Sequence, residues 1–250
     1  MSASAPVSTR LAALLAKDLR GIVRDRLLLF LLGYGVVIAA VLRLVLPLVP
    51  VENLGIYVAP AAPLIGILLV GSVLGLGLVD ERESGTWLLL RVLPVSDASL
   101  GAYLCSVAAG VGLVAGVACA LVYGQPVERP LLYGAALLSA SLGAPALAFF
   151  IGSLASNKIE AMAIGKLANI PMAAPILAFV LPAPWHLFLW WSPSYWIYLA
   201  LLRGAAPEAA LRDASLVIPE LPDAAFVAIP VLLLVGSGVP LVRRFRVVAS

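Results

Sequence analysis

The chain has 250 residues, of which 63% are hydrophobic and only 12% charged, and its mean hydropathy is +1.10. A soluble domain carries about a quarter charged residues, so this chain has too little polar surface to cover a core in water. The formal charge of +3 is too small to indicate a nucleic-acid partner. The composition therefore predicts an all-α membrane protein that folds as a single helical bundle in contact with membrane lipid.

The chain begins with a basic, amphipathic segment. Between residues 9 and 26 the apolar side chains recur at helical spacing, and Lys17, Arg20 and Arg24 can face lipid headgroups. We expect an interfacial helix here. The apolar run that follows is too long for the core of a secretory signal.

Six apolar stretches follow, each close to the roughly 20 residues that a membrane-spanning helix needs. We expect spans near residues 27–46, 56–79, 100–123, 131–154, 161–181 and 224–242. Gly71, Gly75, Gly77, Gly112 and Gly116 lie inside them and are expected to let helices pack closely.

The distribution of Lys and Arg predicts the orientation. With a cytoplasmic N-terminus, the inner segments hold twelve basic residues: Arg10, Lys17, Arg20, Arg24, Arg26, Arg82, Arg91, Lys158, Lys166, Arg243, Arg244 and Arg246. The outer segments and outer helix ends hold four: Arg43, Arg129, Arg203 and Arg212. Six spans place both termini in the cytoplasm. The composition is consistent with a bacterial inner membrane.

The segment 182–223 is the longest stretch outside the expected spans. It contains Trp185, Trp190, Trp191, Tyr195 and Trp196, and such rings favour the membrane interface. We expect short helices that lie in the outer leaflet or dip into it. A seventh span is the competing interpretation, and it would place the basic tail outside.

The sequence contains no catalytic or metal-binding constellation. His186 is the single histidine, whereas a zinc site needs three or four ligands. The run from Gly165 to Leu167 lacks the upstream glycine and the hydroxyl of a phosphate-binding loop, so we do not expect this chain to hydrolyse ATP. Arg43, Glu160 and Lys166 lie near span ends, where snorkelling or structural pairing is expected. Cys105 and Cys119 would lie roughly 21 Å apart along one helix, too far for a disulfide.

The segment 80–99, after the second span, is expected to be a cytoplasmic loop. A charged cluster from Asp80 to Glu83 leads into Ser84, Gly85 and Thr86, and an apolar run at residues 87–90 follows. One interpretation is a solvated loop with a short amphipathic helix. The other is a docking surface for a partner protein, because the apolar run would be exposed at the membrane surface.

This segment resembles the signature of ABC type-2 exporter permeases. The run Glu81-Arg82-Glu83-Ser84-Gly85-Thr86 and the later Pro94-Val95-Ser96 carry the resemblance. The segment 156–167 also resembles the junction between the fourth and fifth spans of small drug-export permeases, including fluoroquinolone exporters. The resemblance covers nearly the whole chain.

The resemblance implies a permease subunit that works with two cytoplasmic ATPase subunits, which would bind ATP and Mg, and with a second copy or a sister permease. It assigns ATPase coupling to Glu81, Arg82, Glu83, Gly85 and Thr86, with Lys17, Arg20 and Arg24 on the N-terminal helix as a second patch. A pathway between two permeases would be lined by the first, second and fifth spans.

Polar residues on those spans are few, namely Tyr34, Tyr57, Ser72 and Asn169. A hydrophobic or amphiphilic substrate, such as a drug or lipid-like molecule, is therefore expected. An ion- or proton-coupled carrier is the alternative function, and it predicts inverted repeats and ionisable groups deep in the membrane. An intramembrane enzyme is a further alternative, and it predicts polar clusters on facing spans.

Overall fold

A computed structural model describes residues 26–50, 54–85, 97–172, 175, 185, 188–207 and 221–248. The elements within these ranges are helices. In chain order they are α2 (Arg26–Val45), the short 3-10 helix η1 (Leu46–Leu48), α3 (Leu54–Val58), α4 (Ala61–Glu83), α6 (Asp97–Tyr123), α7 (Pro130–Ser141), α8 (Gly143–Leu154), α9 (Lys158–Met172), α11 (Pro193–Ala205) and α13 (Asp223–Val248).

Four helical stretches are long and apolar enough to cross a membrane: Leu54–Glu83, Ser99–Tyr123, Pro130–Leu154 and Asp223–Phe245. They correspond to the second, third, fourth and sixth expected spans. The first expected span overlaps α2, and the shorter apolar helical stretch Gly33–Leu48 lies within α2 and η1. The fifth begins as α9, and residues 173–181 lie outside the described residues except for 175. The chain is a multi-pass membrane protein. Six spans and cytoplasmic termini stay predictions.

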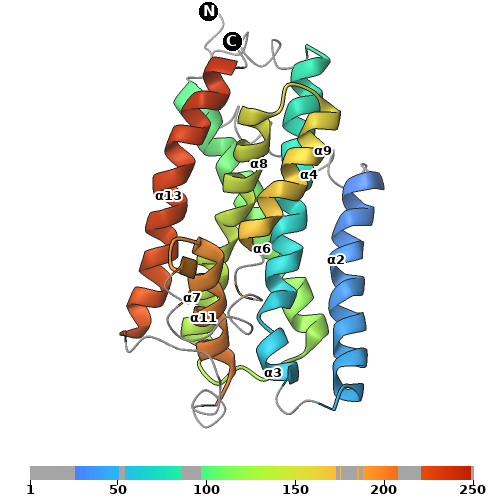
Figure 1. The fold of residues 1–250 in the computed structure, drawn as a ribbon, viewed down its shortest axis with the longest axis vertical. Helices are drawn as coiled ribbons and strands as arrows, with labels where there is room; N and C mark the ends of the chain where they lie inside the picture. The colour runs from blue at the N-terminus through green and yellow to red at the C-terminus, as the bar shows by residue number, and fades with distance from the viewer. Residues whose placement is uncertain are drawn as a thin grey trace, which may run out of the picture.

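The long helices stand side by side and roughly parallel to one axis (Figure 1). α2 begins at the same end of the bundle at which α4, α8 and α13 finish and α9 starts. We call this the clasp end. α3 and α11 lie at the opposite end, which we call the α3 end. The helices therefore run alternately up and down the bundle.

Glycines allow α4 to approach its neighbours α6 and α8. A Cβ atom on Gly71 would lie 2.8 Å from the carbonyl oxygen of Ala144, and one on Gly75 would lie 2.9 Å from Cβ of Ile151. Gly112 and Gly116 on α6 are equally crowded. Close backbone approach adds van der Waals contact, which replaces the hydrophobic effect as the force that joins helices in lipid. The packing role is confirmed for these four glycines. It was wrong for Gly77, since nothing lies within 4 Å of a Cβ placed there.

Part of the aromatic segment, Pro193–Ala205, forms the buried helix α11 near the α3 end. Tyr195, Trp196 and Tyr198 on α11 are all at most 3% exposed, and α11 packs against α7 and α13. The Tyr198 hydroxyl donates to the carbonyl oxygen of Tyr57 at 2.5 Å, and this bond joins α11 to α3. These rings therefore pack inside the protein, whereas Trp185 and Trp191 are exposed. The location of the segment in the outer leaflet stays a prediction.

Arginines at the α3 end pair with other groups of the protein. Nη1 of Arg43 donates to the carbonyl oxygen of Val122 at 3.0 Å, which satisfies a terminal carbonyl of α6. Arg129 and Arg203 lie 3.3 and 3.1 Å from the two carboxylate oxygens of Asp223, the first residue of α13. For Arg43, the structure favours structural pairing over snorkelling alone.

Candidate functional site

The charged cluster of the ABC-like segment lies on the last turn of α4. The helix continues to Glu83, four residues beyond the expected end of the span. Ser84 caps it, its backbone N–H donating to Asp80, and Gly85 follows with φ of 72°. This left-handed conformation is the usual way to end a helix and favours glycine, because a Cβ atom is disfavoured there. Gly85 therefore makes the turn that leads out of α4.

Arg82 joins the end of α4 to the end of α8. Its guanidinium donates to the carbonyl oxygen of Gly152 at 3.1 Å and to that of Ala155. The last carbonyls of a helix have no partner within the helix and carry partial negative charge. Arg82 supplies both the missing donors and the opposite charge. It therefore acts as a C-terminal cap for a neighbouring helix.

Two acidic residues of the same turn hold the start of α9. Oε2 of Glu83 accepts a hydrogen bond from the backbone N–H of Lys158 at 3.3 Å. Oδ1 of Asp80 lies 3.0 Å from Nζ of Lys158, and both side chains are more than half exposed, at 60% and 54%. An ion pair in contact with water contributes about 0–1 kcal/mol to stability, so this pair orients the two helices more than it stabilises them.

The turn between α8 and α9 is itself ordered by side chains. Asn157 accepts a hydrogen bond from the backbone N–H of Glu160 at 2.9 Å, and Glu160 accepts one from the N–H of Ser156 at 2.7 Å. Both bonds satisfy donors at a helix start, as a capping box does. The expected structural role of Glu160 is therefore a cap. Lys166 is exposed on the same helix.

α13 reaches the same place through Phe245. This ring is 1% exposed and packs edge-on against Phe149, with centroids 5.6 Å apart. A Cβ atom on Gly152 would lie 3.2 Å from the Phe245 ring. The carbonyl oxygen of Gly152 thus accepts a hydrogen bond from Arg82, and the Cα atom of Gly152 faces the Phe245 ring. We call Asp80, Arg82, Glu83, Gly152, Ala155 and Lys158 the clasp; it joins the ends of α4 and α8 to the start of α9.

The remaining predicted coupling residues are only partly described. Glu81 and Glu83 are exposed, and Arg82 and Gly85 are half-buried. Thr86 and the N-terminal residues Lys17, Arg20 and Arg24 lie outside the described residues, as does the apolar run 87–90.

The predicted pathway residues are spread over separate helices. Tyr34 is 47% exposed on α2, Tyr57 lies on α3, and Ser72 is half-buried on α4. Asn169 belongs to α9, but its side chain is outside the described part. A cavity of about 360 Å³ lies between α6, α8 and α13, and none of these four residues lines it. Among the described residues, no three His, Cys, Asp or Glu side chains gather where they could hold a metal ion.

The structure adds residues that the sequence reasoning did not connect. Lys158, Gly152 and Ala155 contact the charged turn of α4, although about 70 to 78 positions separate the partners. The two segments that resemble exporter permeases, 81–86 and 156–167, thus meet at one end of the bundle. The sequence did contain a signal for this proximity, since both segments follow an expected span and lie on the same expected side of the membrane.

Comparison with known families identifies the family of this chain. A family model described as "Fluoroquinolones export permease protein Rv2686c-like" matches residues 18–221. The match includes the clasp and the helices α2 to α11 around it. No protein with a curated description matches the chain significantly. Because the family model covers most of its length, the chain belongs to the Rv2686c-like family of fluoroquinolone export permeases.

Proposed function

We propose that the chain is the transmembrane permease subunit of an ATP-binding-cassette exporter in a bacterial inner membrane. Separate ATPase subunits hold ATP and Mg and drive the export of a hydrophobic or amphiphilic substrate. The observation that carries the proposal is the clasp. The segment that resembles the ABC type-2 signature ends α4 and is bound directly to the helix junction that resembles drug-export permeases.

The clasp has the mechanical properties that coupling needs. Arg82 and Glu83 bond to backbone atoms of α8 and α9 rather than to flexible side chains. A displacement of the turn at Gly85 is therefore transmitted to three helices together. Glu81 and Glu83 also present carboxylates on the surface, and such charges orient a docking partner.

The placement of charge in the long helices favours an ATP-driven machine over an ion-coupled carrier. Leu54–Glu83 carries its charged residues from Asp80 onward, and Asp223–Phe245 carries them at Asp223 and from Arg243 onward. Ser99–Tyr123 and Pro130–Leu154 contain no Asp, Glu, Lys or Arg. Carriers that move protons or ions use ionisable side chains in the membrane interior. These four helices offer no such group for coupling.

A second permease, identical or a sister subunit, would pack against α2. The exposed apolar residues of α2 recur at helical spacing and form one face: Phe30, Tyr34, Val37, Val41 and Leu44. This face includes Tyr34, a predicted pathway residue. The proposed pathway thus lies where α2 of one subunit meets its partner.

The experiment is uptake of a fluoroquinolone into inverted membrane vesicles that contain the chain and its ATPase. We expect uptake that requires ATP, is stopped by vanadate and survives a protonophore. Vesicles that contain the chain with a hydrolysis-deficient ATPase provide the control. Uptake that is abolished by the protonophore and indifferent to vanadate would support the carrier and overturn the proposal.

A further inference from the structure

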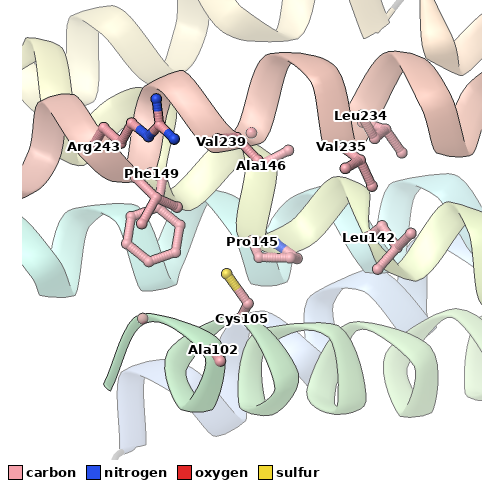
Figure 2. A pocket seen from close by; sticks show the side chains of 13 residues that line it. Ala102, Cys105, Leu142, Pro145, Ala146, Phe149, Leu234, Val235, Val239 and Arg243 are labelled. Atoms are coloured by element: carbon pink, nitrogen blue, oxygen red, sulfur yellow. The ribbon is translucent and has the colours of Figure 1, made fainter. Parts of the chain in front are cut away.

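A groove runs along the outside of the bundle at the clasp end. α8 forms its floor, and α6 and α13 form its walls; Figure 2 shows side chains from both walls facing each other across α8. Its volume is about 360 Å³, within the range of small-molecule sites. The lining comes from the first turns of α6, including Gly101 and Cys105, from residues 142–149 on the floor, and from residues 234–243 of α13.

The groove faces the surface that lipid covers. Val235 and Val239 are 51% and 48% exposed, and Leu232 on the same helix is 70% exposed. Small residues keep the space open, since Gly101, Gly238 and Ala146 have little or no side chain. The side chains of the walls are hydrocarbon apart from the Cys105 thiol and one charged group. The occupant that suits them is therefore largely a hydrocarbon chain.

That group is Arg243, which lies at one end of the groove beside Phe149, while Leu234 and Leu142 lie at the other end (Figure 2). Leu234 and Arg243 are nine residues apart on α13, which corresponds to about 14 Å of helix. One leaflet occupies about half of the roughly 30 Å hydrocarbon core. The groove is thus about one leaflet deep, with a cation at the level where headgroups begin.

We propose that the groove is a binding site for one anionic phospholipid of the leaflet at the clasp end. Its phosphate pairs with the guanidinium of Arg243, which is suited to bidentate contact with phosphate oxygens. One acyl chain lies along α8 between Ala146 and Gly238 and ends near Leu234. This site does not depend on how transport is driven.

The test is native mass spectrometry of the purified full chain with phosphatidylglycerol or phosphatidylcholine of identical acyl chains. We expect one retained phosphatidylglycerol, favoured about tenfold (about 1.4 kcal/mol) over phosphatidylcholine, because Arg243 repels the choline cation that accompanies the phosphate of the latter. Gly238→Leu fills the groove and should lose this lipid, whereas Gly236→Leu should retain it. The two positions form a matched pair, because nothing lies within 4 Å of a Cβ on either glycine and only Gly238 lines the groove.

A second pair of variants tests the charge. Arg243→Gln should remove the preference for phosphatidylglycerol, and Arg244→Gln, which changes an exposed arginine outside the lining, should keep it. Phosphatidylglycerol should also slow maleimide modification of Cys105, which lines the groove, while Cys119 is 1% exposed and serves as the internal reference.

Three outcomes would overturn the proposal. The first is equal retention of both lipids by the wild type. The second is equal retention by Gly238→Leu and Gly236→Leu, with both variants monodisperse and of similar melting temperature. In the third, a fluoroquinolone alone gives the adduct that Gly238→Leu abolishes while phosphatidylglycerol gives none, which would make the groove a substrate site.

Discussion

Nζ of Lys158, the first residue of α9, lies 3.0 Å from Oδ1 of Asp80 on the last turn of α4. The pair joins two segments that are 78 positions apart and that each resemble exporter permeases. Both side chains are more than half exposed, so their attraction is screened by water and salt. Its importance is therefore one of position, because it fixes where α9 begins relative to the turn at Gly85.

Exchanging the charges of Asp80 and Lys158 should distinguish the role of the pair in positioning α9 from its contribution to stability. We expect Lys158→Asp to place two carboxylates together and to impair fluoroquinolone export, with a loss of stability of only about 1 kcal/mol. The double variant Asp80→Lys with Lys158→Asp should restore export. Drug accumulation in cells and melting temperature provide the two measurements. If the double variant exports no better than the single one, the pair has no positional role.

Arg82 should be the most sensitive residue of the clasp. Arg82→Gln removes charge-assisted hydrogen bonds to two terminal carbonyls, which are worth about 1.5–3 kcal/mol each. Because glutamine can keep one uncharged hydrogen bond, we expect a net loss of about 2 kcal/mol, which lowers the melting temperature by roughly 4–8 °C for a chain of this size. Thermal unfolding in detergent measures it. As a control, Arg244→Gln changes an exposed position on α13, and its melting temperature should stay within about 2 °C of that of the wild type. Equal shifts of the melting temperature in the two variants would show that Arg82 is not a cap.

The glycines of α4 give a test of helix packing. Gly71→Ala would bring a methyl group to 2.8 Å from the backbone oxygen of Ala144, which cannot move without displacing α8. We expect a loss of about 1–3 kcal/mol, as for other overpacked sites. Gly77→Ala has open space and should be neutral or stabilising by up to about 1 kcal/mol. Melting temperatures in one detergent compare the two; a tolerated Gly71→Ala would contradict the close contact of α4 with α8.

At the end of α6, a glycine in the left-handed conformation lies beside a cation. Gly124 has φ of 71°, and a Cβ atom there would lie 2.5 Å from Nη1 of Arg43. Gly124→Ala should therefore push the Arg43 guanidinium off the Val122 carbonyl, so stability should fall by the roughly 1–2 kcal/mol of the left-handed conformation plus the value of that hydrogen bond. In an Arg43→Ala background, the loss of stability caused by Gly124→Ala should fall to the cost of the left-handed conformation alone. Gly110→Ala, in open space on the same helix, is the control; equal losses from Gly124→Ala in both backgrounds would show that the Arg43 contact is absent.

Sequence reasoning predicted the helices well, because the hydropathy of each long span is a local property. It missed what depends on contacts between distant residues. The coupling role of Arg82 stays a prediction, but its hydrogen bonds to Gly152 and Ala155 could not be foreseen, because only the fold places these residues beside it. Gly77 was grouped with Gly71 and Gly75, although a position two residues after Gly75 points to another face of the helix. Likewise, buried α11 has the same aromatic composition as an interfacial helix, so composition did not distinguish them.

The most direct test of the account is whether the clasp end binds an ATPase. The tagged chain would be co-expressed with its candidate ATPase, solubilised and purified, and the bound ATPase and its hydrolysis rate would be measured. The variants are Glu81→Lys at the clasp end and Glu128→Lys, an exposed carboxylate in the turn between α6 and α7 at the α3 end. We predict that wild type and Glu128→Lys retain an active ATPase and that Glu81→Lys loses it or leaves its hydrolysis insensitive to the drug. An ATPase retained equally by all three proteins with unchanged drug response, or one that binds none of them although all are folded, would contradict the account.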